Sequence, residues 1–412
     1  MNFKEIRSNI LRVAMSRGVV IFLGMLTVTI IARYLGPVQQ GKFSYISLTI
    51  NILVTIFSLG LPSSVVYYIG KSKNEREKKQ IVINSNFILA KSYLIGISFC
   101  MFAIFLAPDE LEIVDLVSDK TIFILIIVGF LLRLIFNHVQ HIQIGFQNFT
   151  KYNITAVVQS SIYALLVLMF MTTISLSAAT AIISLLISLL VPILLNINRE
   201  WKKWDVNYQI CKKLIVYGVK SHLNNVISFL MYRTDLLMIG YFLGVKAVGL
   251  YSIVMLIIES LQLLTTSAAT VLFSHVSHKG DGEHKVVIKS IVTLSMINLL
   301  IVLIIFVTSE YLVTFLFGDE YYASIQILNV LVWVVFFSTI SRVIGSYFAG
   351  INKLNYNLYL AVILFFANMI LNVCFITNYG LIGAPYATLL VVIANAIIKT
   401  LLLSYYINGN KK

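Results

Sequence analysis

The stretch ARYLGPVQQGKFSY, residues 32–45, separates two long apolar runs and carries two glycines and a proline. A similar stretch, GYFLGVKAVGLYSI, returns at residues 240–253. Gly-Pro is a strong signal for the end of a helix, and a later glycine permits a tight re-entry into the next one. An offset of 208 residues aligns the two stretches, and the pairs are Tyr34 with Phe242, Gly36 with Gly244, and Gly41 with Gly249. We therefore expect the same helix–turn–helix unit at two places in the chain.

The composition excludes a soluble domain. Of the 412 residues, 59% are hydrophobic and only 12% are charged, whereas soluble proteins have about 25% charged residues. The apolar runs reach the length of about 20 residues that a helix needs to cross a bilayer. The sequence thus predicts an all-α polytopic membrane protein. The net charge of +14 does not indicate nucleic acid as a partner, because much of it lies in short loops where Lys and Arg set topology.

We expect about twelve spans, near residues 11–33, 43–69, 81–106, 121–145, 154–172, 176–197, 215–242, 249–274, 286–308, 324–349, 356–377 and 382–407. Basic loops alternate with acidic ones along this series. The basic loops are 71–79, 199–213 and 279–289, and the acidic ones are 108–119 and 318–321. Positively charged loops stay inside, so both termini are predicted to be cytoplasmic and the stretch at 32–45 is an outside turn.

A second internal match supports the repeat. At an offset of 204, His138 falls on Arg342, and the residues Asn148, Tyr152 and Asn153 fall on Asn352, Tyr356 and Asn357. Two matches in the same order predict two six-helix lobes, 1–197 and 215–412, joined by a cytoplasmic linker at 198–214. Six spans per half leave both halves in one orientation, so a parallel pseudo-repeat with a central cavity between the lobes is expected. The same architecture is compatible with a channel.

Polar side chains within spans are costly and usually face a cavity or a partner. In span 7 the spacing of five of them predicts one shared helical face, and these are Ser221, Asn225, Ser228, Tyr232 and Asp235. The other candidates for lining a cavity are Asn51, Asn137 and Gln262. Arg233, Asp235 and Glu259 are candidates either for ion coupling or for structural pairing.

Basic groups within spans outnumber the embedded acids. Lys91, Arg133 and Arg342 lie at depth, with His141 on the same face as Arg133, while only Asp235 and Glu259 are clearly embedded acids. This surplus favours an anionic cargo. Arg17 and Lys399 lie near inner helix ends, where long basic side chains snorkel to the interface. A single buried charge can also serve packing alone.

No catalytic set is present in the sequence. It has no His-Glu-x-x-His zinc motif, no P-loop and no Gly-x-Ser-x-Gly elbow. We therefore expect no enzyme activity, no metal and no cofactor. Any driving force then has to come from an ion gradient, from the substrate gradient or from a partner.

Several motifs resemble those of one family, and they are Ala32-Arg-Tyr-Leu-Gly-Pro, Arg233-Thr-Asp-Leu-Leu-Met-Ile-Gly, Leu316-Phe-Gly-Asp-Glu-Tyr and Gly380-Leu-Ile-Gly-Ala-Pro-Tyr. In order and spacing they are similar to the signatures of the Wzx-type O-antigen and polysaccharide repeat-unit flippases. That family belongs to the superfamily of multidrug and toxin exporters and the peptidoglycan-precursor flippase.

The resemblance implies a multi-pass inner-membrane protein of lipopolysaccharide or other surface polysaccharide biosynthesis. Its cargo would be an undecaprenyl-diphosphate-linked oligosaccharide, moved from the cytoplasmic to the periplasmic leaflet by alternating access. Lys91, Arg133, Arg342 and His141 would bind the pyrophosphate. The sugars would contact the polar group Asn51, Asn137, Asn225, Tyr232 and Gln262. Asp235 or Glu259 would bind a coupling proton or sodium ion.

The implied partners are the lipid-linked glycan, membrane lipids, and the polysaccharide polymerase and chain-length proteins. Alternatives stay open at this point. A multidrug exporter of the same superfamily would favour an acidic cavity for its cationic cargo. A major-facilitator symporter shares twelve spans and a parallel repeat, but its loop signature is absent between spans 2 and 3. A membrane scaffold for a glycan polymerase complex is a third alternative, from a non-transporting class.

Overall fold

The computed structural model describes residues 3–106, 119–173, 176–196, 206–231, 233–279, 284–351 and 353–409. Every regular element in these ranges is helical. The first half contains α1 (Phe3–Phe57), α2 (Leu61–Lys71), α3 (Glu75–Leu106), α5 (Lys120–Gly145), α6 (Phe149–Thr173), α7 (Ala178–Asn196) and α8 (Tyr208–Met231). The second half contains α9 (Thr234–Lys279), α10 (His284–Phe317), α11 (Ser324–Gly350), α12 (Leu354–Tyr379) and α13 (Gly383–Gly409), with short 3₁₀ helices at Asp319–Tyr321 and Gly380–Ile382.

The expected polytopic helical architecture is confirmed. Nine helical stretches in the described ranges are long and apolar enough to cross a membrane. Three of them, at 16–57, 234–273 and 355–408, contain a break. A straight helix of 42 residues, the first of these stretches, would be about 63 Å long, twice the hydrocarbon thickness. Such a stretch therefore makes more than one crossing, while the number twelve itself stays a prediction.

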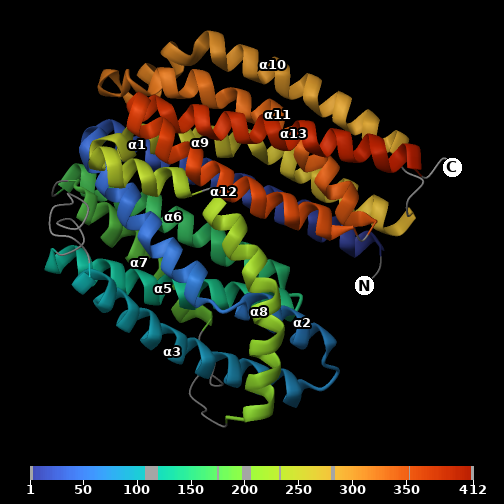
Figure 1. Ribbon diagram of the computed structural model, residues 1–412. Helices are drawn as coiled ribbons and strands as arrows, with labels where there is room; N and C mark the ends of the chain where they lie inside the picture. The colour runs from blue at the N-terminus through green and yellow to red at the C-terminus, as the bar shows by residue number, and fades with distance from the viewer. Residues whose placement is uncertain are drawn as a thin grey trace. The chain divides into compact units, whose positions relative to one another are not determined.

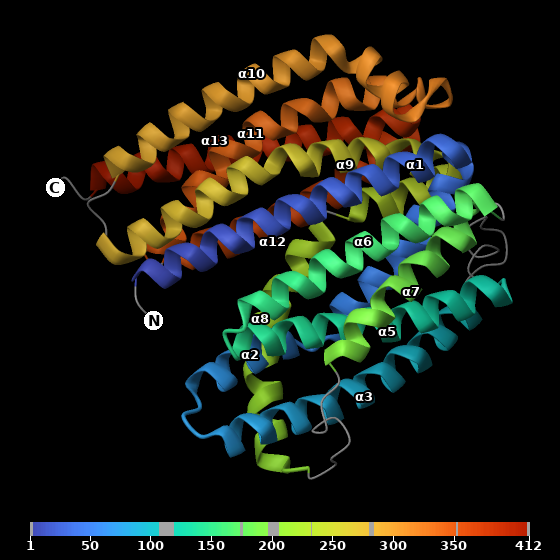
Figure 2. The ribbon, with the colours of Figure 1, turned by 180° about the vertical axis from the view of Figure 1, so that it is seen from behind.

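The chain divides into two compact units, and unit 1 comprises residues 1–35 and 42–229. Its central helix is α5, which packs against α2, α3, α6 and α7 (Figure 2). Phe130 on α5 is fully buried and contacts both Phe57 and Tyr93. Gly129, beside it, lets Ile50 approach so closely that an added Cβ would lie 2.5 Å from the Ile50 Cδ1. The apolar core of unit 1 is thus built around one helix.

Unit 2 comprises residues 36–41 and 230–412 and has α11 at its centre. This helix packs against α9, α10, α12 and α13 (Figure 1). A buried polar node ties three of these helices together: the Asn298 amide of α10 donates to the hydroxyls of Thr265 on α9 and Thr339 on α11, both at 3.1 Å. The two hydroxyls lie 3.1 Å apart. A satisfied polar contact of this kind fixes the register of packed helices.

The helix bounds follow the internal repeat. Helices α2 and α9 end at Lys71 and Lys279, 208 residues apart. The central helices α5 and α11 begin at Lys120 and Ser324, 204 residues apart. The drift arises because the chain between α10 and α11 is shorter than the chain between α3 and α5. A deletion at that place accounts for the two offsets, so the helix bounds agree with the internal repeat.

The six-helix lobes at 1–197 and 215–412 stay a prediction. The boundary between the compact units falls at Phe229. Most of the first part of the predicted linker, residues 198–205, lies outside the described ranges.

The two aligned stretches share their backbone geometry. Gly36 has φ 70° and ψ 174°, and Gly244 has φ 79° and ψ −177°, while the residues on either side are helical. Only glycine adopts such angles without strain. The helix end predicted at Gly36-Pro37 is therefore confirmed, and the next helix begins at once.

The role expected for the second glycine was wrong. Gly41 and Gly249 lie inside helices and not at the turn. A Cβ on Gly41 would lie 1.9 Å from the Val245 carbonyl oxygen, and a Cβ on Gly249 would lie 1.9 Å from the Pro37 carbonyl oxygen. The segment 36–41 thus packs on α9 by two reciprocal backbone contacts, and both require glycine.

The single helix expected over residues 215–242 was also wrong. Helix α8 ends at Met231 and α9 starts at Thr234. The chain tightens here, because the Arg233 amide donates to Leu230 O at 3.0 Å, three residues back, instead of four. The predicted polar face from Ser221 to Asp235 is therefore not continuous.

Candidate functional site

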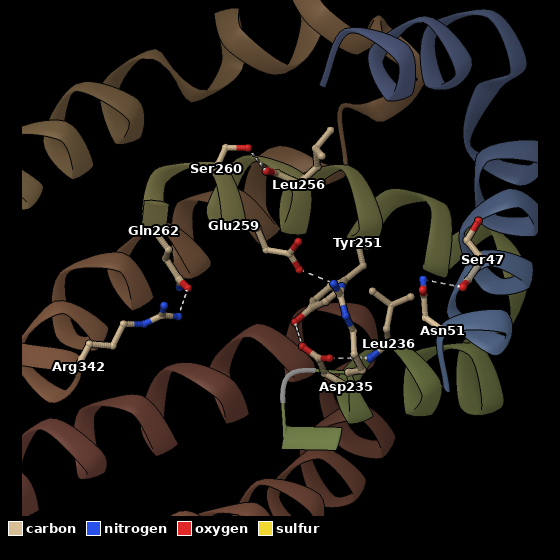
Figure 3. A network of polar contacts seen from close by, with 11 residues as sticks. Ser47, Asn51, Asp235, Leu236, Tyr251, Leu256, Glu259, Ser260, Gln262 and Arg342 are labelled. Carbon is tan, nitrogen blue, oxygen red and sulfur yellow. Dashed lines mark hydrogen bonds and ion pairs between the residues drawn. The ribbon is translucent and has the colours of Figure 1, made fainter. Parts of the chain in front are cut away.

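The two acids of unit 2 that were predicted to be embedded both have partners, but only Asp235 is buried, because the Glu259 side chain is 45% exposed. The Glu259 carboxylate forms an ion pair with Arg233, with Nη1 and Oε1 2.9 Å apart (Figure 3). Asp235 is 4% exposed and accepts two hydrogen bonds, one from the Tyr251 hydroxyl at 2.5 Å and one from the Leu236 amide at 2.8 Å. Arg233 and Asp235 thus have separate partners, as their spacing of two residues requires. The pair Arg233–Glu259 fastens the start of α9 to its own second half.

Arg342 on α11 is held by neutral side chains of α9. Its Nη1 donates to Thr266 Oγ1 at 2.7 Å, and its Nη2 donates to Gln262 Oε1 (Figure 3). Gln262 and Thr266 are four residues apart on one helix, so they lie on the same face. Thr266 is exposed, which leaves this side of the guanidinium accessible. The predicted candidates Arg342 and Gln262 are therefore in direct contact.

The position of Lys399 near a helix end predicted that its side chain would snorkel to the membrane interface. In the structure it contacts a neighbouring helix instead. Its ammonium donates to the Ser341 carbonyl of α11 at 3.1 Å. The absent side chain of Gly345 makes this approach possible, since a Cβ there would lie 2.9 Å from Lys399 Nζ. Sequence reasoning missed this residue, although the glycine one turn after Ser341 marks the place where another helix can approach.

The two candidate cations of unit 1 lie on different helices. Arg133 of α5 has its guanidinium 5.8 Å from the Phe136 ring, and Lys91 of α3 has its ammonium 4.4 Å from the Phe87 ring. Lys91 is exposed, whereas Arg133 is partly buried. Within the described ranges no hydrogen bond or ion pair joins either of them to an acid or to the other. The described contacts of both cations are with aromatic faces, which favour positive charge.

Two further candidates bond to their own helix. His141 Nδ1 lies 2.7 Å from the Asn137 carbonyl, and the Asn51 amide donates to the Ser47 carbonyl at 2.9 Å (Figure 3). These contacts hold both side chains along their helices. Tyr232 lies outside the described residues, and of Asn225 the structure describes only the backbone.

The structure adds a buried polar contact between α3 and α5. His138 Nε2 lies 3.1 Å from Ser85 Oγ and 3.0 Å from Asn86 Oδ1. His138 is 1% exposed. Its match to Arg342 in the internal repeat is the signal that could have singled it out.

The charged candidates thus differ in their described contacts. Asp235 contacts Tyr251, and Glu259 pairs with Arg233. In unit 1 the described contact of Arg133 is with an aromatic ring, so an anion would be a favourable counterpart for this cation.

A family model for polysaccharide biosynthesis proteins matches residues 6–278, more than half of the chain. The chain belongs to this family. A second model, MatE, matches residues 221–374, which lie mostly in unit 2. The first match confirms the family that the four motifs predicted.

Two curated proteins are similar to this polysaccharide biosynthesis protein, and both bear provisional names. A low-salt glycan biosynthesis flippase, Agl15, of Haloferax volcanii is 24% identical over 241 residues. That match covers 57% of this chain and 51% of the relative, so the chain spans about half the length of that protein. An O-antigen transporter of Shigella flexneri is 24% identical over 386 residues, which cover 89% of this chain and 90% of the relative.

A solved structure shows the same fold. The lipid II flippase MurJ in an inward closed conformation superposes with a TM-score of 0.76 at 14% identity, over 95% of this chain and 87% of that one. At this identity the likeness concerns the fold alone. It confirms the predicted two-lobed helical fold class.

Proposed function

We propose that this polysaccharide biosynthesis protein is a flippase for lipid-linked oligosaccharide. Its cargo is an undecaprenyl-diphosphate-linked repeat unit of O-antigen or a related surface polysaccharide, moved from the cytoplasmic to the periplasmic leaflet of the inner membrane by alternating access. Both termini are cytoplasmic in this proposal. The family, the names of the two relatives and the fold support it.

The observation that carries the proposal is the environment of Arg133, a partly buried cation that lies on an aromatic face, without an acid among its described contacts. A diphosphate would supply the negative charge. Arg342 is held in a defined orientation by the side chains of Gln262 and Thr266. Arg342 and Arg133 are therefore proposed as cargo contacts, and Lys91 and His141 as weaker ones.

The sugars require hydrogen-bonding groups that are not cations. Gln262 is the best placed of these, because its amide nitrogen stays available while its oxygen holds Arg342. Asn137 and Asn51 are further candidates on α5 and α1, and Asn225 and Tyr232 stay predictions from the sequence. Because the chain belongs to a polysaccharide biosynthesis family, the polymerase and chain-length proteins are proposed as its partners.

The acidic pair is proposed to serve coupling. Asp235 is buried and holds the Tyr251 hydroxyl, and Glu259 holds Arg233, so a proton or sodium ion at either carboxylate would loosen a contact at the start of α9. Transport would then be driven by an ion gradient and not by a chemical reaction of the protein.

The test is a flippase-deficient strain that receives the gene. Surface polymer should return with the unchanged protein and fall with Arg342→Ala or Arg133→Ala, while lipid-linked single units accumulate inside. Lys353→Ala is the matched control, since Lys353 is an exposed cation of unit 2. If both arginine variants leave surface polymer normal at equal protein level, the cationic cargo site is refuted.

A multidrug exporter is the second candidate, favoured by the MatE match over residues 221–374. Its cationic cargo would need free carboxylates, yet both Asp235 and Glu259 are engaged. Resistance to cationic dyes in the same strain, without recovery of polymer, would favour the exporter.

A further inference from the structure

The first half of α8 packs on unit 1 with one of its faces. Cys211, Leu214 and Gly218 are buried, and their spacing of three and four residues places them on one side of the helix. The Asn84 side-chain oxygen of α3 accepts hydrogen bonds from the Asn207 amide at 2.7 Å and from the Cys211 thiol at 3.2 Å. The start of α8 is therefore fixed to α3.

The outer face of the same segment is exposed and carries both apolar and basic side chains. Its exposed apolar residues are Tyr208, Ile215, Val216 and Val219. Lys212 and Lys213 are exposed as well. Residues 206–219 contain no acid. Apolar side chains beside lysines on the outer face of a helix are typical of a helix that lies in the membrane interface.

The direction of α8 agrees with this pattern. In both views α8 runs across the direction of α3 and α5 (Figure 1 and Figure 2). Its 24 residues would be long enough to cross a bilayer, yet α8 is not among the nine stretches of the described ranges that are apolar enough to do so. Asn84, to which α8 is fixed, lies about 4.5 Å along α3 from residue 81, where the predicted span begins. The start of α8 is thus held at the level of a membrane surface.

Aromatic and basic groups of α2 lie beside this segment. The rings of Tyr217 and Tyr67 stack with their centroids 4.4 Å apart, and the Tyr68 ring lies 5.7 Å from Tyr217. Lys71, the last residue of α2, has its ammonium 5.7 Å from the Tyr67 ring. The loop 71–79 that begins there has five basic and two acidic residues. Tyrosine gathers at the level of lipid headgroups, so this end of unit 1 has the composition of an interface with surplus positive charge.

We propose that the outer face of residues 206–219 docks on the membrane surface and binds headgroups of anionic phospholipids through Lys212 and Lys213. Charge decides the occupant, because a neutral lipid offers these lysines no net negative charge, whereas an anionic surface favours each basic group about fivefold. Helix α8 is the last helix of unit 1, so the lipid would hold the segment through which the chain passes into unit 2. This inference does not rest on the proposed cargo.

The experiment uses a fluorophore attached to Val216→Cys in the full chain, which is reconstituted in nanodiscs. Cys100 and Cys374 are changed to serine, and Cys211 is kept because it is buried. Brominated lipids quench a fluorophore only at close range. Titration of brominated phosphatidylglycerol against brominated phosphatidylcholine therefore measures the preference of this face for the anionic lipid. We expect both lipids to quench and phosphatidylglycerol to be preferred.

Charge variants of the face test the role of the two lysines. Lys212→Gln and Lys213→Gln should each lower the preference for phosphatidylglycerol by up to about fivefold, and Lys212→Arg should retain it. Lys120→Gln is the matched control, because Lys120 is an exposed cation of the same unit at the start of α5 and should leave the preference unchanged.

Three results would overturn the proposal. Quenching by neither lipid would show that this face does not meet the bilayer, and would favour a protein as its partner. Equal quenching by the two lipids, or an unchanged preference in both lysine variants, would show that anionic headgroups do not bind there. Failure of the gene to restore surface polymer, with the lipid preference intact, would instead reject the flippase function and leave this inference standing.

Discussion

Replacing Gly41 by alanine tests the closest backbone contact in unit 2. The new Cβ would lie 1.9 Å from the Val245 carbonyl oxygen and 2.8 Å from its carbon. An ordinary contact between carbon and oxygen is about 3.3 Å or more, so the two backbones have to separate by about 1.4 Å. Overpacking of a helix contact costs about 1–3 kcal/mol. We expect the upper end, about 3 kcal/mol, because no side chain can rotate away.

The reciprocal position sharpens this prediction. Gly249→Ala places its Cβ 1.9 Å from the Pro37 carbonyl oxygen, on the other side of the same contact, and should cost as much. The double variant should cost clearly less than the two losses added, because the first substitution already separates the backbones. Gly24→Ala is the matched control. It lies in α1 with nothing within 4 Å of its Cβ and should be neutral or stabilising by about 0.5–1 kcal/mol.

The assay measures the midpoint of heat denaturation in detergent. The readout is the fraction of protein that still elutes as a single species after heating. Both contact variants should lower the midpoint, and Gly24→Ala should not. Equal midpoints for Gly41→Ala, Gly249→Ala and the control would refute the close approach of segment 36–41 to α9. Strictly additive losses would show that the two glycines act at separate places.

Three further predictions concern side chains. Asn298→Leu removes the donor that joins Thr265 and Thr339 and should destabilise unit 2 by about 1–3 kcal/mol, read as a lower denaturation midpoint, whereas Asn298→Asp should lose less if the hydroxyls donate in return. Arg233→Gln and Glu259→Gln should each lower the amount of surface polymer, and the double variant should recover part of that loss. If the loss in the double variant equals the product of the two single losses, the single variants do not act through the ion pair. Lys91→Ala should reduce surface polymer less than Arg133→Ala does, because Lys91 is exposed and Arg133 lies inside the helix bundle; the reverse order would move the cargo contact to α3.

The fold was predictable because its signals are local and physical. Long apolar runs indicate the membrane spans. A glycine followed by proline indicates a helix break, and the backbone angles of Gly36 show that break. The repeat was predictable because both offsets align rare polar and glycine positions within apolar helices. Gly41 was recognised as a repeated position, but its role was misread. A glycine that admits a neighbouring backbone looks in sequence like a glycine that makes a turn.

The break between α8 and α9 could not be read from the sequence. Residues 229–236 contain neither glycine nor proline, so the helical pattern appears continuous. The interruption coincides with Arg233, whose side chain pairs with Glu259. Tertiary contacts of this kind can override local helix propensity, and a sequence pattern gives no measure of them.

The polar residues show the same limit in another form. The sequence singled out Gln262 and Arg342 as candidates, and the structure brings the two side chains into contact. The spacing cannot report which helix supplies the next group, so Lys399 was assigned to the interface although it contacts Ser341. Gly345 leaves room for the Lys399 ammonium to reach the Ser341 carbonyl, so this side chain contacts a neighbouring helix instead of the interface.

The two units therefore use one backbone frame with different chemistry. Equivalent carbonyls, at Asn137 and Ser341, receive a histidine nitrogen in one unit and a lysine ammonium in the other. In unit 1 this contact stays within one helix, whereas in unit 2 it joins two helices, because Gly345 leaves room for Lys399 at the position that His141 occupies in unit 1. The same backbone position thus serves a local contact in one unit and a contact between helices in the other.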